Sequence, residues 1–220
     1  MNEYLFLFHI TLIVVITWAT RIHSKEALIG WVILQPILAN LFVLKQIDLF
    51  GFCVTCSDVY AVGALLGINY LQEYYGRQCA QNALRLSMLG MLLFVMMSML
   101  HLAYGPSEQD SSNAAYTLVL GQSPRLFAAS ILSFLLVQQI DIRFFAYLAQ
   151  TALSFKLRNF ITLTLSQVLD TLFFTIFGLA GILDNLLDIF IMSVTVKCAI
   201  STYLAFASPH DQHEAHKTQN

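Results

Sequence analysis

Long apolar runs alternate with short polar breaks along almost the whole chain, from Tyr4 to Ala207. A helix needs about 20 mostly apolar residues to cross a bilayer, and the runs come close to that length. They predict membrane-spanning helices over residues 4–20, 27–44, 53–75, 84–104, 124–150, 158–180 and 186–207. We therefore expect a single transmembrane domain over residues 1–207, followed by a polar tail at 208–220.

Composition supports the membrane interpretation. Of the 220 residues, 58% are hydrophobic and only 11% are charged, and the mean hydropathy is +0.70. A soluble domain carries about 25% charged residues. The sequence also lacks the alternating segments of about ten residues that mark a membrane barrel. The predicted fold class is an all-α integral membrane protein, a polytopic helical bundle.

Basic residues beside the apolar runs predict the orientation of the bundle, because cytoplasmic loops are enriched in Lys and Arg. The second and fourth connections carry only Lys45 and Arg125. The first, third and fifth connections carry six bases: Arg21, Lys25, Arg77, Arg85, Lys156 and Arg158. We therefore expect the N-terminus outside and the C-terminal tail in the cytoplasm.

The stretch from Ser57 to Gly76 carries polar residues inside an otherwise apolar helix. These are Asp58, Asn69, Gln72 and Glu73. Positions eleven apart nearly eclipse on an α-helix, so Asp58 and Asn69 share one face, and Glu73 follows Asn69 by about one turn. Polar groups on one stripe of such a helix face protein or a wet cavity rather than lipid. This stripe is the first candidate for a binding surface.

Polar residues also interrupt the last three predicted spans. Gln138-x-x-Asp141 and Gln167-x-x-Asp170 each place an amide and a carboxylate on one helical face, and Lys197 lies inside the last span. A charge at the bilayer centre costs about 2.5–3.5 kcal/mol, so these groups should meet inside the bundle. Together they predict an acceptor-rich cavity that suits a ligand with several N–H donors, such as a purine-like base.

Structural roles are the alternative for several of these charged residues. Lys197 would neutralise a buried carboxylate, Asp170 or Asp141, as an ion pair. Asp58 would cap the start of its helix. Glu73 would pair at the interface with the base one turn further along.

The sequence contains no motif typical of an enzyme. Walker A, H-E-x-x-H, G-x-S-x-G and Rossmann glycine patterns are missing, and no basic stripe indicates nucleic-acid binding. We therefore expect no catalytic residue, no cofactor, no metal site and no nucleic-acid partner. Without a Walker A motif, ATP-driven transport would need a separate energising subunit.

Four segments in this order resemble the queuosine precursor transporter family, also called vitamin uptake transporters: NYLQEYYGRQCA, SPRLFAASILSFLLVQQIDIRFF, SQVLDTLFF and VTVKCAIS. The resemblance covers residues 29–207. It implies a bacterial inner-membrane protein, surrounded by lipid, with a six-helix core similar to the substrate-binding subunits of energy-coupling-factor transporters. The span at 4–20 would be an extra helix. The implied function is import of a 7-deazaguanine base, such as queuine, preQ0 or preQ1, for salvage into the tRNA nucleoside queuosine.

The resemblance also places functional residues on this chain, with Asn69 standing where the family often has Asp. Combined with the polar stripe, it gives nine substrate-binding candidates: Asn40, Asp58, Asn69, Glu73, Gln139, Asp141, Gln167, Asp170 and Lys197. Two other functions stay open. The chain would be a ligand-binding subunit that needs an ATPase partner, or a transporter of another heterocyclic vitamin.

Overall fold

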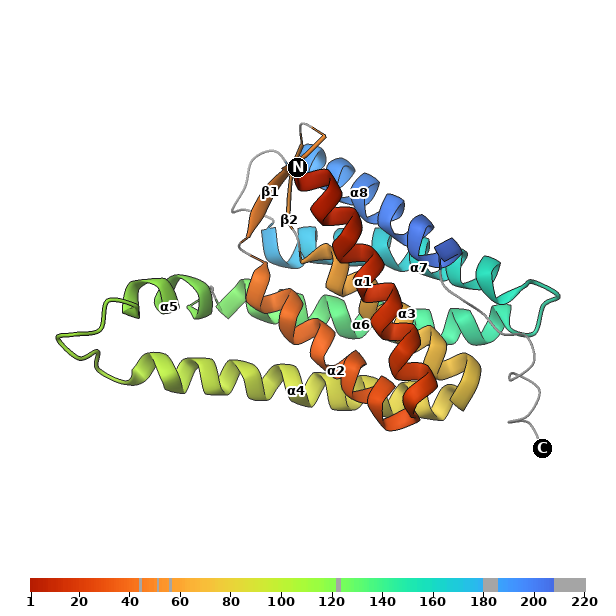
Figure 1. Ribbon diagram of the computed structural model, residues 1–220, viewed down its shortest axis with the longest axis horizontal. Helices are drawn as coiled ribbons and strands as arrows, with labels where there is room; N and C mark the ends of the chain where they lie inside the picture. The colour runs from red at the N-terminus through yellow and green to blue at the C-terminus, as the bar shows by residue number, and fades with distance from the viewer. Residues whose placement is uncertain (44, 51, 56, 122–123, 180–185, 208–220) are drawn as a thin grey trace.

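The computed structural model is a bundle of long helices (Figure 1). It describes residues 1–43, 45–50, 52–55, 57–121, 124–179 and 186–207, so the predicted tail lies outside the described residues. Within these residues the helices are α1 (Asn2–His23), α2 (Lys25–Phe42), α3 (Asp58–Tyr75), α4 (Arg77–Ala103), α5 (Asn113–Leu120), α6 (Pro124–Leu148), α7 (Phe155–Phe174) and α8 (Leu186–Ala207). A π-helical turn, η1 (Thr175–Leu179), continues α7.

The predicted all-α polytopic membrane class is confirmed. Five helices in the described part of the chain are long and apolar enough to cross a membrane: α1, α2, α4, Ala128–Leu148 of α6, and Phe155–Gly178 of α7 and η1. Neither α3 nor the described part of α8 meets this criterion. The seven-span topology therefore stays a prediction.

The third predicted span, residues 53–75, overlaps the second strand of a short β-hairpin formed by residues 46–49 and 52–55. Strand β2 (Phe52–Thr55) pairs antiparallel with β1 (Gln46–Leu49), and the following helix begins only at Asp58. Hydrophobicity alone does not separate a short apolar strand from the beginning of a helix. The aromatic and β-branched residues of the segment FCVT favour the strand.

Helix α3 is the centre of the bundle. Fourteen of its 18 residues are buried, and it contacts α1, α2, α4, α6, α7 and α8. Two glycines one turn apart allow its neighbours to approach closely. A Cβ atom at Gly63 would lie 2.7 Å from Cγ2 of Ile13, and one at Gly67 would lie 2.5 Å from Cγ2 of Val32. Small residues at this spacing are typical of tight packing between membrane helices.

Adding one methyl group at Gly67 is expected to destabilise the bundle. The new Cβ of Gly67→Ala would collide with Val32, which is fully buried and, being β-branched, has little rotamer freedom. We expect overpacking to cost about 1–3 kcal/mol and to lower the Tm of the detergent-solubilised protein. Gly30→Ala is the matched control, because a Cβ there meets nothing within 4 Å. Equal Tm values for the two variants would contradict the close contact of α2 with α3.

Three helix junctions meet at one end of the bundle. The hydroxyl of Tyr75, at the end of α3, donates to the carbonyl oxygen of Arg21 at the end of α1 (3.4 Å). Arg158, near the start of α7, bonds Glu73 on α3. Five of the six bases used to predict the orientation flank these junctions: Arg21, Lys25, Arg77, Lys156 and Arg158. We call this the basic end.

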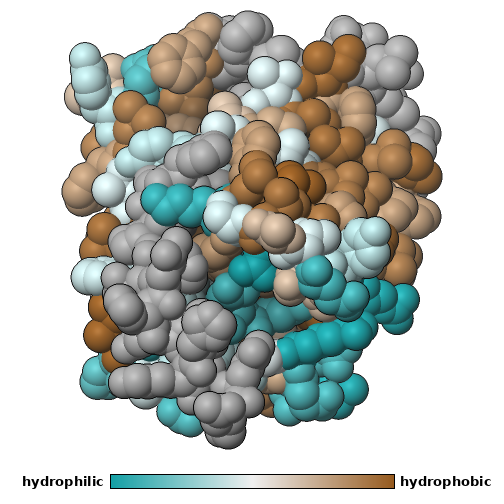
Figure 2. Space-filling model, turned by 90° about the vertical axis from the view of Figure 1, so that its right-hand side faces the viewer, coloured by the Kyte–Doolittle hydropathy of each residue, from teal (hydrophilic) through white to brown (hydrophobic). Residues whose placement is uncertain are grey.

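The opposite end carries the hairpin and the N-terminus, where the amide of Asn2 donates to the carbonyl oxygen of Asp48 (3.1 Å). Figure 2 looks onto the side of the molecule where the α6–α7 connection lies. Hydrophilic residues gather at the lower right of this face, and hydrophobic residues cover much of its upper right. The bundle thus has chemically distinct regions.

Candidate functional site

A line of polar side chains crosses the interior between α3 and the helices α6, α7 and α8. It begins at Asp58 near the hairpin end and finishes at Glu73 near the basic end. An α-helix rises about 22 Å over those 15 residues, most of the roughly 30 Å hydrocarbon thickness of a bilayer. The line divides into three groups at successive depths.

The first group, the lysine cluster, consists of Asp58, Asp170 and Lys197. The Nζ atom of Lys197 on α8 donates to Oδ2 of Asp170 on α7 at 2.8 Å and lies 3.6 Å from Oδ1 of Asp58 on α3. Of the two structural alternatives for these residues, the ion pair of Lys197 with Asp170 is present. Asp58 faces Lys197 rather than capping its helix. The cluster therefore joins three helices through one ammonium and two carboxylates.

The second group, the amide cluster, lies in the middle of the line. The amide nitrogen of Asn69 donates to Oδ1 of Asn159 (2.8 Å) and to the hydroxyl oxygen of Thr162 (3.1 Å). The amide nitrogen of Gln72 donates to the carbonyl oxygen of Ile142 (2.9 Å). These bonds connect α3 to both α7 and α6.

Asp141 on α6 completes the amide cluster. Its Oδ1 atom accepts a hydrogen bond from the hydroxyl of Ser166 on α7 (2.7 Å), and the residue is 1% exposed. Its Oδ2 atom has no hydrogen-bond partner, and within the described residues no base forms an ion pair with it. One turn earlier Gln138 is also buried, whereas the predicted Gln139 is only half-buried. The interior face of α6 therefore carries Gln138 and Asp141.

The amide cluster contains more free acceptors than free donors. Oδ1 of Asn69, Oε1 of Gln72 and Oδ2 of Asp141 have no hydrogen-bond partner, against one free donor, Nδ2 of Asn159. Gln167, beside Ser166 on α7, is fully buried with both amide atoms unpartnered. Buried polar atoms are nearly always hydrogen-bonded, and an unsatisfied one costs about 1–3 kcal/mol. The arrangement is suited to a ligand that supplies several N–H donors.

The third group, the arginine pair, lies nearest the basic end. Nη2 of Arg158 approaches Oε1 of Glu73 to 2.6 Å, and the two side chains are only 10% and 12% exposed. The guanidinium also lies 5.2 Å from the ring centroid of Phe145. The expected alternative partner of Glu73, Arg77, is exposed instead. The pair therefore joins α3 to α7 inside the bundle rather than at its surface.

Asn40 lies apart from this line, between α2 and α6. Its amide nitrogen donates to the carbonyl oxygen of Pro36 (2.8 Å), and its Oδ1 accepts from the hydroxyl of Ser130 (3.1 Å). The first bond lies within α2, and the second links α2 to α6. The structure therefore distributes the nine predicted site residues over separate places rather than one shared cavity.

Sequence reasoning missed the contribution of the first half of α7. Asn159 and Thr162 were not among the candidates, and Arg158 was used only to orient the bundle. A signal was present: Asn159, Thr162, Ser166 and Asp170 follow one another at intervals of three and four residues. That spacing places them on one helical face and predicts a second polar stripe. The structure packs this stripe against that of α3.

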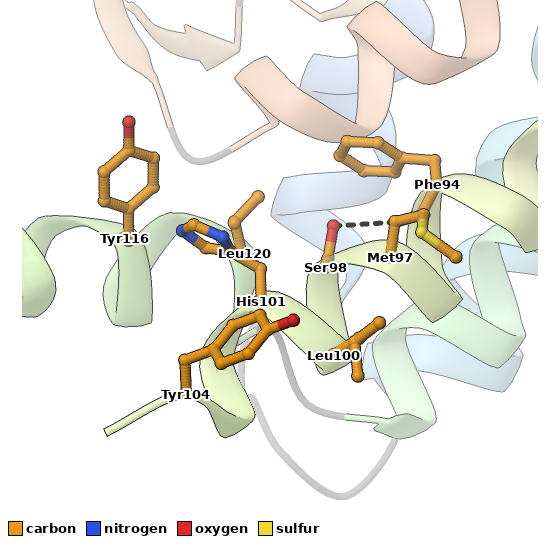
Figure 3. Close-up of a pocket in the computed structure, with 8 residues that line it drawn as sticks. All are labelled: Phe94, Met97, Ser98, Leu100, His101, Tyr104, Tyr116 and Leu120. Carbon is orange, nitrogen blue, oxygen red and sulfur yellow. Dashed lines mark hydrogen bonds between the residues drawn. The ribbon is translucent and has the colours of Figure 1, made fainter. Parts of the chain in front are cut away.

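A pocket of about 460 Å³ lies between the end of α4 and α5, away from the polar line (Figure 3). It is lined by Phe94, Met97, Ser98, Leu100, His101, Tyr104, Tyr116 and Leu120. The hydroxyl of Ser98 donates back to the carbonyl oxygen of Phe94 (2.7 Å), and the rings of His101 and Tyr116 meet edge to face with their centroids 5.3 Å apart. The lining is mostly apolar and contains none of the predicted site residues.

Comparisons with known proteins agree with the membrane architecture. A family model described as "Putative vitamin uptake transporter" matches residues 59–207, which include every residue of the polar line except Asp58. A "Probable queuosine precursor transporter" from Bacillus subtilis (strain 168) is 30% identical over 207 residues, which cover 91% of this chain and 90% of the relative. No solved structure matches. The expected likeness to energy-coupling-factor subunits therefore stays a prediction.

Proposed function

The chain belongs to the vitamin uptake transporter family, and from that premise we propose that it imports a queuosine precursor, a 7-deazaguanine base such as queuine, preQ0 or preQ1. It is a multi-pass membrane transporter rather than an enzyme. The choice of substrate is supported by the name of the Bacillus subtilis relative. It is also supported by the chemistry of the amide cluster.

The observation that carries the proposal is the unpaired oxygen of Asp141. A buried carboxylate whose only partner is a neutral hydroxyl lacks much of the stabilisation that a buried charge requires. A ligand with two parallel N–H groups would supply it, because a carboxylate accepts such an edge through charge-assisted hydrogen bonds. The ring N–H and exocyclic amine of a 7-deazaguanine form such an edge. We therefore assign Asp141 to this edge of the base.

The remaining free atoms of the amide cluster complement the same ligand. Oδ1 of Asn69 and Oε1 of Gln72 are acceptors for further N–H groups of the base or of its substituent. Nδ2 of Asn159 is a donor for the carbonyl oxygen of the ring. A deazaguanine presents donors on one edge and this carbonyl beside them. The excess of free acceptors over free donors, which are Nδ2 of Asn159 and Nε2 of the neighbouring Gln167, therefore fits it better than it fits an anionic vitamin.

The other two groups would then lie on either side of the substrate along the membrane normal. We place the basic end in the cytoplasm and the chain in the bacterial inner membrane, following the distribution of Lys and Arg. A base moving inward would pass the lysine cluster first, the amide cluster next and the arginine pair last. Glu73, Asp58, Asp170 and Lys197 would then act on the path of the substrate rather than on its recognition.

Complementation tests the substrate. Cells that lack both queuosine precursor synthesis and their own transporter receive this chain, a matched tRNA-modifying enzyme and one deazaguanine base at low concentration. We expect queuosine to appear in tRNA with at least one base, and only when the chain is expressed. Good membrane expression without queuosine from any of the three bases would contradict the proposed substrate. Uptake of a different heterocyclic vitamin by the same cells would favour the other reading of the family.

Reconstitution tests whether the chain transports alone. The purified protein in lipid vesicles is expected to exchange labelled base across the membrane without any added subunit. Binding of the base without exchange would identify the chain as a ligand-binding subunit that needs an ATPase partner.

A further inference from the structure

We infer that the lysine cluster is a proton-binding site, and that the proton taken up there drives import. This inference rests on the proposed function, because coupling needs a transported substrate. It assigns Asp58, Asp170 and Lys197 to a role distinct from recognition of the base.

The charges of the lysine cluster do not balance. With all three groups ionised, two carboxylates face one ammonium, and the sum is one negative charge. The side chains of Lys197 and Asp58 are only 8% and 10% exposed, and that of Asp170 is 23% exposed. An uncompensated charge inside a membrane bundle is costly, so such groups pair, neutralise or bind a cation. One added proton makes the cluster neutral.

Geometry identifies Asp58 as the carboxylate that takes the proton. Asp170 lies 2.8 Å from Nζ of Lys197 and accepts a hydrogen bond, whereas Asp58 lies 3.6 Å away. Protonation of Asp58 keeps the shorter, hydrogen-bonded ion pair intact. The step is simple: one O–H bond forms on the Asp58 carboxylate with a proton from the outer water, and the same bond breaks when the proton is released inside.

Three titratable groups on other parts of the elements packed against the lysine cluster, one each on α1, α6 and α8, bear on this assignment. On α1 the group is His9, whose ring centroid lies 5.0 Å from that of Tyr60. Tyr60 follows Asp58 by two residues on α3. On α6 the candidate is Asp141, which bonds Ser166 instead. On α8 Cys198 is adjacent to Lys197. None of the three forms an ion pair with the cluster within the described residues.

The same helices carry the lysine cluster and the amide cluster. Asp58 shares α3 with Asn69 and Gln72, and Asp170 shares α7 with Asn159. Loss of the Asp58–Lys197 attraction on protonation therefore loosens α3 from α8 and changes how α3 sits against α7. A proton can thus alter the substrate site without touching it. This requires only that α3 and α7, which carry residues of both clusters, move as rigid elements.

Infrared spectroscopy tests the proton site without substrate. The purified protein is titrated, and the carboxylic acid C=O stretching band of buried side chains is followed in difference spectra. We expect wild type to show a protonated carboxyl that Asp58→Asn lacks. Asp48→Asn, which alters an exposed carboxylate of the hairpin, should retain it. Identical spectra from wild type and Asp58→Asn would overturn the proton site.

Vesicle transport tests the coupling, with the base that restores queuosine in cells as the probe. With the membrane potential clamped at zero, a gradient of one pH unit, acid outside, should let wild type and Asp48→Asn accumulate a neutral base about tenfold. Asp58→Asn should still exchange labelled base but accumulate none. Accumulation by Asp58→Asn that still follows the pH gradient would overturn the coupling. Accumulation driven by a sodium gradient instead of the pH gradient would overturn it as well.

These readouts separate the two claims. If no deazaguanine base restores queuosine in cells but wild type shows the Asp58 infrared band, the proton site is supported and the proposed substrate is contradicted. If wild type exchanges labelled base equally well at every pH gradient and never accumulates it, the substrate is supported and the coupling is contradicted.

Discussion

Asp141→Asn is expected to reduce uptake of the deazaguanine base by about 100-fold at low concentration. A hydrogen bond to a charged group contributes about 1.5–3 kcal/mol, and the substitution removes the charge from two of them at once. The shape of the side chain is retained, and the remaining carbonyl oxygen can still accept the bond from Ser166, so the fold should persist. Concentration-dependent uptake of labelled base, normalised to protein in the membrane, measures the effect.

Asp110→Asn is the matched control for this variant. Asp110 lies in the exposed connection before α5, so the same chemical change there should leave uptake unaltered. Wild-type uptake by Asp141→Asn at equal expression would show that the base is recognised elsewhere. A change confined to the maximal rate, with no change in KM, would assign Asp141 to a conformational step instead.

Removing one member of the arginine pair should have the largest effect on folding. Arg158→Ala leaves the carboxylate of Glu73 enclosed without its partner, and breaking a buried ion pair in this way costs about 3–5 kcal/mol. We expect a large drop in Tm and in the yield of monodisperse protein in detergent. Thermal unfolding followed by size-exclusion chromatography measures both.

Two further variants make this result specific. Arg143→Ala removes the same side chain from an exposed position of α6 and should change the Tm little. Replacing both members of the pair by Leu should recover most of the loss, because apolar residues of similar volume are tolerated in place of a buried ion pair. If Arg158→Ala and Arg143→Ala lower the Tm equally, the pair contributes no more than an exposed residue.

Helical periodicity predicted the polar faces of α3 and α6, although the polar face of the first half of α7 was missed. The stripe of α3 holds Asp58, Asn69 and Gln72, and all three are buried. The spacing Gln138-x-x-Asp141 also identified the enclosed face of α6 correctly. Assignment by family resemblance chose Gln139 instead, which lies about 100° further around the helix and is half-buried.

Partner choice could not be predicted in the same way, because it depends on contacts between distant parts of the chain. Glu73 pairs with Arg158, 85 residues away, although Arg77 is one turn from it in sequence. Lys197 forms an ion pair with Asp170, which was one of the two partners proposed from the sequence. Its second carboxylate partner, Asp58 of α3, was not among them. Periodicity assigns a face to each helix, whereas the packing of the bundle decides which faces meet.

Close packing was a further feature that hydrophobicity did not indicate. Gly63 and Gly67 are apolar positions in a hydropathy profile, yet they determine how near α1 and α2 approach α3. Their spacing of four residues was a readable signal. Strands β1 and β2 had a weaker signal, the aromatic and β-branched residues of FCVT, because hydrophobicity alone does not separate a short apolar strand from the beginning of a helix.

The central position of α3 has a consequence for how the protein is made. A newly synthesised helix enters a bilayer according to its own hydrophobicity, and α3 is too polar to qualify, whereas α4 is among the most apolar helices of the chain. Only Gly76, with a φ of 84° that favours glycine, separates the two helices. We therefore expect α3 to insert into the membrane together with α4 as a helical hairpin, with the insertion of α3 depending on the hydrophobicity of α4. Asp58 and Glu73 of α3 gain their basic partners only after α7 and α8 have been synthesised, so the polar interior is completed by the last third of the chain.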